Sequence, residues 1–282
     1  MNESKATSAD AAGREGHNLL LRIGAALVLA PLAIAVAYAG GWLWVVFVTL
    51  AAIGLYAEWL TIIAARTAVS MLAGTVVIVA AGWIEFDQTA SGYVFAALAA
   101  IVVSIALTAP NHHGWVALGA CYALAASMAS IAVRLDQAFG FTALMLVLLV
   151  VWATDIGGYF AGRHIGGPKL WQRVSPKKTW AGSIGGFAAS LVVAAGFAAL
   201  GLGKVLPMLA LGALLSIVAQ LGDLFESAVK RRFGVKDSSQ IIPGHGGLLD
   251  RLDGFVAAVV FAAIFGFLRG GADGVGRGLM VW

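Results

Sequence analysis

One apolar segment of the chain, residues 205–226, ends in polar side chains that share one helical face. At about 100° per residue, Gln220, Asp223, Ser227 and Lys230 fall within an arc of about 80°, and Glu226 flanks them. If this segment crosses a membrane, its polar groups are costly and are expected to face a bundle interior or a water-filled cavity. The stripe therefore predicts a functional interior face. The alternative is a solvated helix end that carries an Asp/Lys pair.

The stretch that follows, residues 227–254, gathers further groups that could do phosphate and metal chemistry. Its centre, Pro243-Gly-His-Gly-Gly247, has little side chain to pack, and its glycines allow backbone amides to approach a ligand closely. Asp250, Arg251 and Asp253 come next, with the two acids one helical turn apart. Together with Asp223, they offer the hard oxygen ligands that Mg²⁺ uses when it also holds substrate phosphates.

Simpler interpretations of this stretch stay open. Asp250 could act only as an N-cap of the last apolar segment, and the lysines could belong to a solvated loop. We expect His245 to hydrogen-bond or to handle a proton rather than to bind a metal, because no second histidine lies nearby.

Two upstream features add to the candidate site. Asp155 follows some fourteen nearly unbroken apolar residues, so we expect it to point into the same interior. In "VSPKKTWAG", Ser175 as N-cap with a proline at the first helical position predicts a helix start. Free amides there, beside Lys177, Lys178 and Thr179, would form a phosphate site. Juxtamembrane lysines that only report topology are the alternative.

The composition identifies the elements that must position these residues. Of 282 residues, 61% are hydrophobic and only 11% are charged, and the mean hydropathy is +0.92, whereas soluble domains carry about 25% charged residues. Crossing a bilayer takes about 17–25 apolar residues. The chain has about nine such segments, at 20–39, 42–63, 68–84, 91–109, 115–133, 139–161, 180–201, 205–226 and 254–268. We therefore expect an all-α polytopic membrane protein with about nine transmembrane helices and two cytoplasmic catalytic loops.

The basic residues predict the orientation of these spans. If the connections alternate between two sides, about fourteen of the 18 Lys and Arg residues fall on one side, so the amino terminus and both basic loops are expected in the cytoplasm. Topology alone explains the pI of about 9.4, and no nucleic acid is needed to account for it. Ala37-Tyr38-Ala39 resembles a signal-peptidase site, but an uncleaved first span is the favoured interpretation.

The chain divides into three parts by composition. Residues 1–18 form a polar cytoplasmic tail, residues 19–135 a transmembrane scaffold and residues 136–282 a catalytic transmembrane region. Glu58 is an exception among the apolar residues of the scaffold. One cysteine, Cys121, excludes a disulfide framework or a cysteine-rich zinc site within the chain, and we expect it to pack between helices.

The run from Ser227 to Asp253, "SAVKRRFGVKDSSQIIPGHGGLLDRLD", resembles the full signature of the phosphatidate cytidylyltransferases, also called CDP-diacylglycerol synthases. The upstream motifs "ATDIGGYFAGR", "SPKKTWAG" and "QLGDLFES" are similar to that family too. The resemblance thus covers roughly residues 150–254, whereas residues 1–149 match only in being apolar and multi-spanning.

The resemblance implies an enzyme that condenses CTP with phosphatidate, giving CDP-diacylglycerol and pyrophosphate. Catalysis would then be positioning and charge neutralisation. It implies Mg²⁺, with a second cation possible, bound by Asp223 and Asp250 with Asp253 close by. The expected catalytic residues are Asp223, Asp250, Lys236, His245 and Arg251. The expected substrate-binding residues are Asp155, Ser175, Lys177, Lys178, Thr179, Ser227, Lys230, Arg231, Gly246 and Gly247. A homodimer in the bilayer is expected from the family alone.

Two other functions compete with this interpretation. A CTP-dependent polyprenol or dolichol kinase would also need spans, metal-binding acids and cations for CTP, but it would release CDP instead of pyrophosphate, and the full signature argues against it. A secondary transporter would use intramembrane Asp155 and Asp223. It has no need for a glycine-histidine loop, and related halves would be expected, whereas the acids here are confined to one half.

Overall fold

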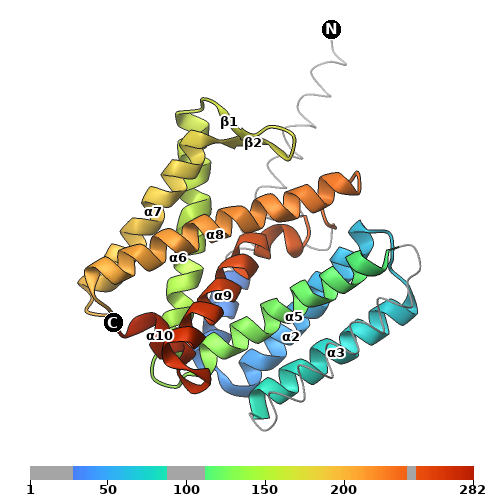
Figure 1. Cartoon of the computed structure of the whole chain (residues 1–282), viewed down its shortest axis with the longest axis horizontal. Helices are drawn as coiled ribbons and strands as arrows, with labels where there is room; N and C mark the ends of the chain where they lie inside the picture. The colour runs from blue at the N-terminus through green and yellow to red at the C-terminus, as the bar shows by residue number, and fades with distance from the viewer. Residues whose placement is uncertain (1–27, 88–111, 240–245) are drawn as a thin grey trace, which may run out of the picture.

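The computed structural model describes residues 28–87, 112–239 and 246–282, which form a bundle of helices with one small β-hairpin (Figure 1). The long helices are α2 (Gly41–Ile62), α3 (Ala68–Asp87), α5 (His113–Leu135), α6 (Gly140–His164), α7 (Trp180–Ala199), α8 (Val205–Arg232) and α9 (Leu249–Gly270). Strands β1 (Lys169–Trp171) and β2 (Ser175–Thr179) connect α6 to α7, and η1 (Ala272–Gly274) and α10 (Val275–Met280) follow α9.

The helices have the lengths and composition of a multi-pass membrane protein. Within the described ranges, six helices are long and apolar enough to cross a membrane, namely α2, α5, α6, α7, α8 and α9. Two shorter apolar stretches accompany them, the helix Val28–Ala39 and the part of α3 from Ala68 to Trp83. The predicted span at 91–109 lies outside the described residues. The all-α membrane architecture is therefore confirmed, while the count of nine spans stays a prediction.

Two hydrophobic cores hold the helices together. The first joins α6, α8 and α9 through residues such as Leu144, Leu215 and Val259. The second is built mainly from α2, α3 and α5, and it also includes Val229 near the end of α8 and Leu249 at the start of α9. The neighbouring ends of α8 and α9 are thus packed against the N-terminal helices.

Helices α6 and α7 approach each other closely through glycines. A Cβ atom added to Gly182 would lie 2.9 Å from the carbonyl oxygen of Gly158, and one added to Gly186 would lie 2.5 Å from that of Thr154. Small residues at such an interface let two backbones pack directly against each other in a membrane. This contact fixes the separation of the two helices that carry the hairpin.

Replacement of Gly186 by leucine should lower the stability of the protein, because the new side chain has no space against α6. Overpacking of this kind costs about 1–3 kcal/mol. Gly196→Leu is the matched control, since it lies on the same helix and a Cβ there meets nothing within 4 Å. The thermal midpoint of detergent-solubilised protein should fall for Gly186→Leu only. Equal midpoints for the two variants would contradict this account of the α6–α7 interface.

The hairpin corrects one prediction from the sequence. Ser175 pairs with Trp171, and Lys169 pairs with Thr179, so residues 175–179 form strand β2 instead of the first turn of a helix. Helix α7 begins at Trp180. Its N-cap is Thr179, four residues after Ser175, and the Thr179 hydroxyl oxygen accepts a hydrogen bond from the Gly182 amide at 3.1 Å. The proline after Ser175 favours an extended backbone at Ser175, and Thr179 is itself a good cap.

Candidate active site

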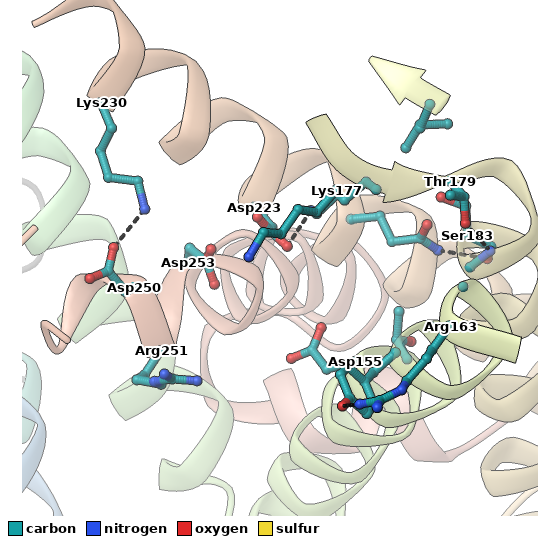
Figure 2. Close-up of a pocket in the computed structure, with 18 residues that line it drawn as sticks. Asp155, Arg163, Lys177, Thr179, Ser183, Asp223, Lys230, Asp250, Arg251 and Asp253 are labelled. Carbon is teal, nitrogen blue, oxygen red and sulfur yellow. Dashed lines mark hydrogen bonds and ion pairs between the residues drawn. The ribbon is translucent and has the colours of Figure 1, made fainter. Parts of the chain in front are cut away.

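A pocket of about 580 Å³ lies between the hairpin and helices α6, α7, α8 and α9 (Figure 2). Nine of the predicted site residues line it together, namely Asp155, Lys177, Lys178, Thr179, Asp223, Lys230, Asp250, Arg251 and Asp253. Strand β2 contacts α8, and the two lysines of this strand line the pocket. The two polar loops of the sequence therefore meet at one site, as their shared topology predicts.

The predicted polar stripe of α8 faces this pocket. Gln220, Asp223 and Lys230 all line it, and the Ser227 hydroxyl donates a hydrogen bond of 3.5 Å to Asp223. Lys178 of the hairpin forms an ion pair with Asp223 across the pocket. The stripe therefore lines the pocket between α8 and the hairpin.

Lys230 links two carboxylates in a largely buried position. Its Nζ lies 2.7 Å from Glu226 on the same helix and 2.6 Å from Asp250 at the start of α9. Glu226 is only 1% exposed and Lys230 9%. Since burying a charge is unfavourable unless it is paired, this arrangement joins the ends of α8 and α9 through a compensated charge cluster.

Asp250 is held by further hydrogen bonds from the loop before α9. Its Oδ2 accepts hydrogen bonds from the backbone amides of Gly247 at 2.9 Å and Ser238 at 3.0 Å, and from the Ser238 hydroxyl at 3.0 Å. Asp250 is therefore not the N-cap considered from the sequence, because α9 begins one residue earlier, at Leu249. Its carboxylate connects the loop, α8 and α9.

A second group of carboxylates lines the same pocket. Asp155 comes from α6, Asp223 from α8 and Asp253 from α9 (Figure 2). Helices α8 and α9 cross closely here, since a Cβ atom on Gly222 would lie 2.8 Å from the carbonyl oxygen of Asp253. The crossing places the acids of two helices next to each other in one cavity.

Comparison with known proteins identifies the family of this chain. Residues 20–268 match the cytidylyltransferase family. The chain belongs to this family. It is 42% identical over 255 residues to a phosphatidate cytidylyltransferase of Brucella suis biovar 1 (strain 1330), and the alignment covers 88% of this chain and 93% of the relative. It is 45% identical over 133 residues to a phosphatidate cytidylyltransferase of Bacillus subtilis (strain 168), covering 45% and 48% of the two chains.

Cytidylyl transfer brings a nucleoside triphosphate to the site, and the pocket offers cations for its phosphates. Lys177, Lys178, Lys230 and Arg251 line it as predicted, and Arg163 on α6 also does so. Arg163 donates a hydrogen bond of 2.6 Å to the hydroxyl of Tyr159 one turn earlier. Arg163 is not among the site residues predicted from the sequence, although its position in "ATDIGGYFAGR", one turn after Tyr159, was a usable signal.

Other predicted site residues of this cytidylyltransferase do not line the pocket. Lys236 and Arg231 are exposed, and Arg231 donates to the carbonyl oxygen of Val235 at 3.1 Å. The Gly247 amide donates to Asp250, so in the structure it serves the carboxylate and not a ligand. Ser175, Ser227 and Gly246 also lie outside the pocket lining, and His245 falls outside the described residues. The roles of these residues stay predictions.

The carboxylates of the pocket suit a hard cation that shares its ligands with a substrate. In the part of the chain that the structure describes, no three Asp, Glu, His or Cys side chains come together closely enough to hold a metal ion by themselves. Mg²⁺ usually uses one or two carboxylates and completes its shell with water and substrate phosphates. Asp223, exposed to the cavity and already paired with one cation, Lys178, fits that requirement.

Proposed function

We propose that this protein transfers the cytidylyl group of CTP to phosphatidate, giving CDP-diacylglycerol and pyrophosphate. The observation that carries the proposal is the convergence of Lys178 from the hairpin on Asp223 of α8, within a pocket of a cytidylyltransferase family member. A relative that aligns with most of the chain is named phosphatidate cytidylyltransferase, and this name supports phosphatidate as the acceptor.

The reaction joins two anionic reactants, so the pocket must neutralise charge. A phosphate oxygen of phosphatidate attacks the α-phosphorus of CTP, and the bond from this phosphorus to the bridging oxygen of the β-phosphate breaks. Lys177 and Lys178 on the hairpin, with Lys230 and Arg251, hold the phosphates and stabilise the charge that develops on the leaving pyrophosphate. Catalysis by these residues is mainly positioning, because no covalent bond to the protein forms.

Asp223 and Asp250 would hold Mg²⁺, with Asp253 beside them, and a second cation is part of the same proposal. When bound, Mg²⁺ supplies charge stabilisation at the phosphoryl oxygens. In the structure, the Asp250 carboxylate accepts hydrogen bonds from Lys230, Ser238 and Gly247. These bonds hold it between the end of α8 and the loop before α9. Asp155 completes the acidic lining from α6.

The orientation of the site in the cell follows from charge. We place the amino terminus, the hairpin and the loop before α9 in the cytoplasm, because most basic residues lie on that side of the predicted spans. CTP then enters from the aqueous side, and phosphatidate enters from the leaflet between helices. The proposal also includes a homodimer in the cytoplasmic membrane, for which the family resemblance is the support.

The function is tested by incubating purified protein with CTP, Mg²⁺ and either phosphatidate or a polyprenol, and identifying the released anion. We expect pyrophosphate and CDP-diacylglycerol with phosphatidate, and no turnover with the polyprenol. Release of CDP with the polyprenol would favour the lipid kinase instead. Absence of turnover with both lipids would reject the proposed activity.

A further inference from the structure

Glu58 is an acid of the N-terminal part of the chain that contacts the loop before α9. It lies on α2 and is only 1% exposed. Its carboxylate accepts four hydrogen bonds, all from residues about 180 or more positions later in the sequence. The donors are the Ser238 hydroxyl at 2.8 Å, the Ser239 hydroxyl at 2.6 Å, and the backbone amides of Leu248 and Leu249 at 2.8 Å each.

Two of these donors belong to the start of α9. The first amides of a helix have no partner within the helix, and a negative charge near them is favourable. The N-cap residue of α9 is Leu248, which has no side chain able to accept such a hydrogen bond. Glu58 supplies the missing acceptor from another helix. The position of the first turn of α9 therefore depends on a carboxylate that lies outside it.

The residues held by Glu58 lead directly to the pocket. Asp250, Arg251 and Asp253 lie in the first turns of α9 and line it. The Ser238 hydroxyl lies 2.8 Å from Glu58 and 3.0 Å from Asp250, so it connects the two carboxylates. A Cβ atom added to Gly247 would collide with both Ser238 and Glu58, and only glycine fits between them. The loop is thus seated tightly on the Glu58 side chain.

Helix α2 is a firm base for this contact. Trp59, the next residue, donates a hydrogen bond of 2.8 Å to the carbonyl oxygen of Trp115 and so fixes α2 to α5. Tyr56 donates to the carbonyl oxygen of Ser70 at 3.2 Å and fixes α2 to α3. Both aromatic side chains are almost fully buried. Because its surroundings are packed, Glu58 cannot follow a movement of the loop without disturbing three helices.

We infer that Glu58 is a positioning residue for the reaction: through the loop and the first turn of α9, it sets the placement of Asp250, Arg251 and Asp253 in the pocket. It does not touch the reactants. This inference deepens the proposed function and rests on it for the kinetic part of its test. It assigns to the N-terminal helices a part in the geometry of the site.

The test compares Glu58→Gln with Thr49→Val, a buried polar position on the same helix that does not contact the loop. Glutamine keeps the shape of the side chain, but its NH₂ group faces donors and cannot accept. We expect kcat to fall about 10- to 100-fold, because a misplacement of about 1 Å can cost about 100-fold. The KM values for CTP and phosphatidate should change less than kcat does. Thr49→Val should retain the wild-type kcat.

Hydrogen–deuterium exchange gives a readout that does not depend on activity. In Glu58→Gln, exchange should rise in residues 246–252 and stay unchanged in α6. If Glu58→Gln folds poorly, Ser239→Ala removes one donor while the carboxylate stays, and the same local rise in exchange with a fall in kcat of about fivefold is expected. If wild-type protein does not turn over CTP and phosphatidate, the proposed function fails, and exchange alone decides whether Glu58 holds this segment.

Two results would overturn the inference. One is a folded Glu58→Gln protein whose kcat lies within about twofold of the wild-type value. The other is an increase in exchange of equal size in α6 and in residues 246–252, because Glu58 would then stabilise the whole bundle without a specific effect on α9.

Discussion

Replacement of Asp223 by asparagine is expected to abolish turnover with CTP and phosphatidate. Asp223 is the acid of α8 that faces the pocket and pairs with Lys178, and it is the first of the proposed Mg²⁺ ligands. Charge stabilisation by a bound cation is worth several kcal/mol, and about 1.4 kcal/mol corresponds to a tenfold change in rate. The expected loss is therefore about 1000-fold or more. Pyrophosphate release from the purified variant measures it.

The same substitution should leave the fold intact, which separates a role in chemistry from one in stability. The side chains of Lys178 and Asp223 are 28% and 30% exposed, and ion pairs with this much exposure contribute little to stability. Asp273→Asn, at an exposed acid of η1, is the control and should keep full activity. Chelation of Mg²⁺ by EDTA should reproduce the loss in the wild-type protein. Near-normal turnover in Asp223→Asn would remove Asp223 from the metal site.

The second large effect is expected for Lys230→Met. The ammonium group of Lys230 compensates Glu226 and Asp250, and its removal leaves two carboxylates in a largely buried site. Breaking a buried pair in this way costs about 3–5 kcal/mol. The temperature at which half of the detergent-solubilised protein still elutes as a folded peak should therefore fall markedly. Turnover should fall as well, because Asp250 loses its partner on α8.

A double variant makes this prediction specific to charge compensation. Adding Glu226→Gln to Lys230→Met removes one of the two unpaired carboxylates, so the elution midpoint should recover part of the loss. The two substitutions would then couple strongly, as expected for groups in direct contact. A Lys230→Met protein with the wild-type midpoint would show that the cluster does not stabilise the joined ends of α8 and α9.

Hydropathy predicted the existence of the helices well and their ends less well. The predicted segment 42–63 corresponds to α2 at Gly41–Ile62, and 180–201 to α7 at Trp180–Ala199. Helix α8, however, continues past residue 226 to Arg232, and α9 begins at Leu249 instead of residue 254. Both extensions carry charged residues. Hydropathy detects only the apolar part of each helix. The extensions carry Lys230, Asp250, Arg251 and Asp253, which line the pocket, and also exposed arginines.

The candidate site could be predicted one element at a time but not across elements. Periodicity placed Asp223 and Lys230 on one face of α8, and the pocket confirms that face. The pairing of Lys178 with Asp223 depends on a hairpin that the sequence did not reveal, because its strands are short and polar. Glu58 was visible only as an unusual acid in an apolar segment, and its partners lie some 180 residues away.

The hydrophobic core that joins α2, α3 and α5 to the ends of α8 and α9 has a consequence for how this protein can be recombined. The difference in composition between residues 19–135 and 136–282 suggests two modules. Val229 and Leu249 of the second part, however, pack in one core with α2, α3 and α5 of the first part. A chimera made by joining the first part of one relative to the second part of another would mismatch that shared core. The boundary near residue 135 is therefore a change in composition and not a joint at which the protein can be divided.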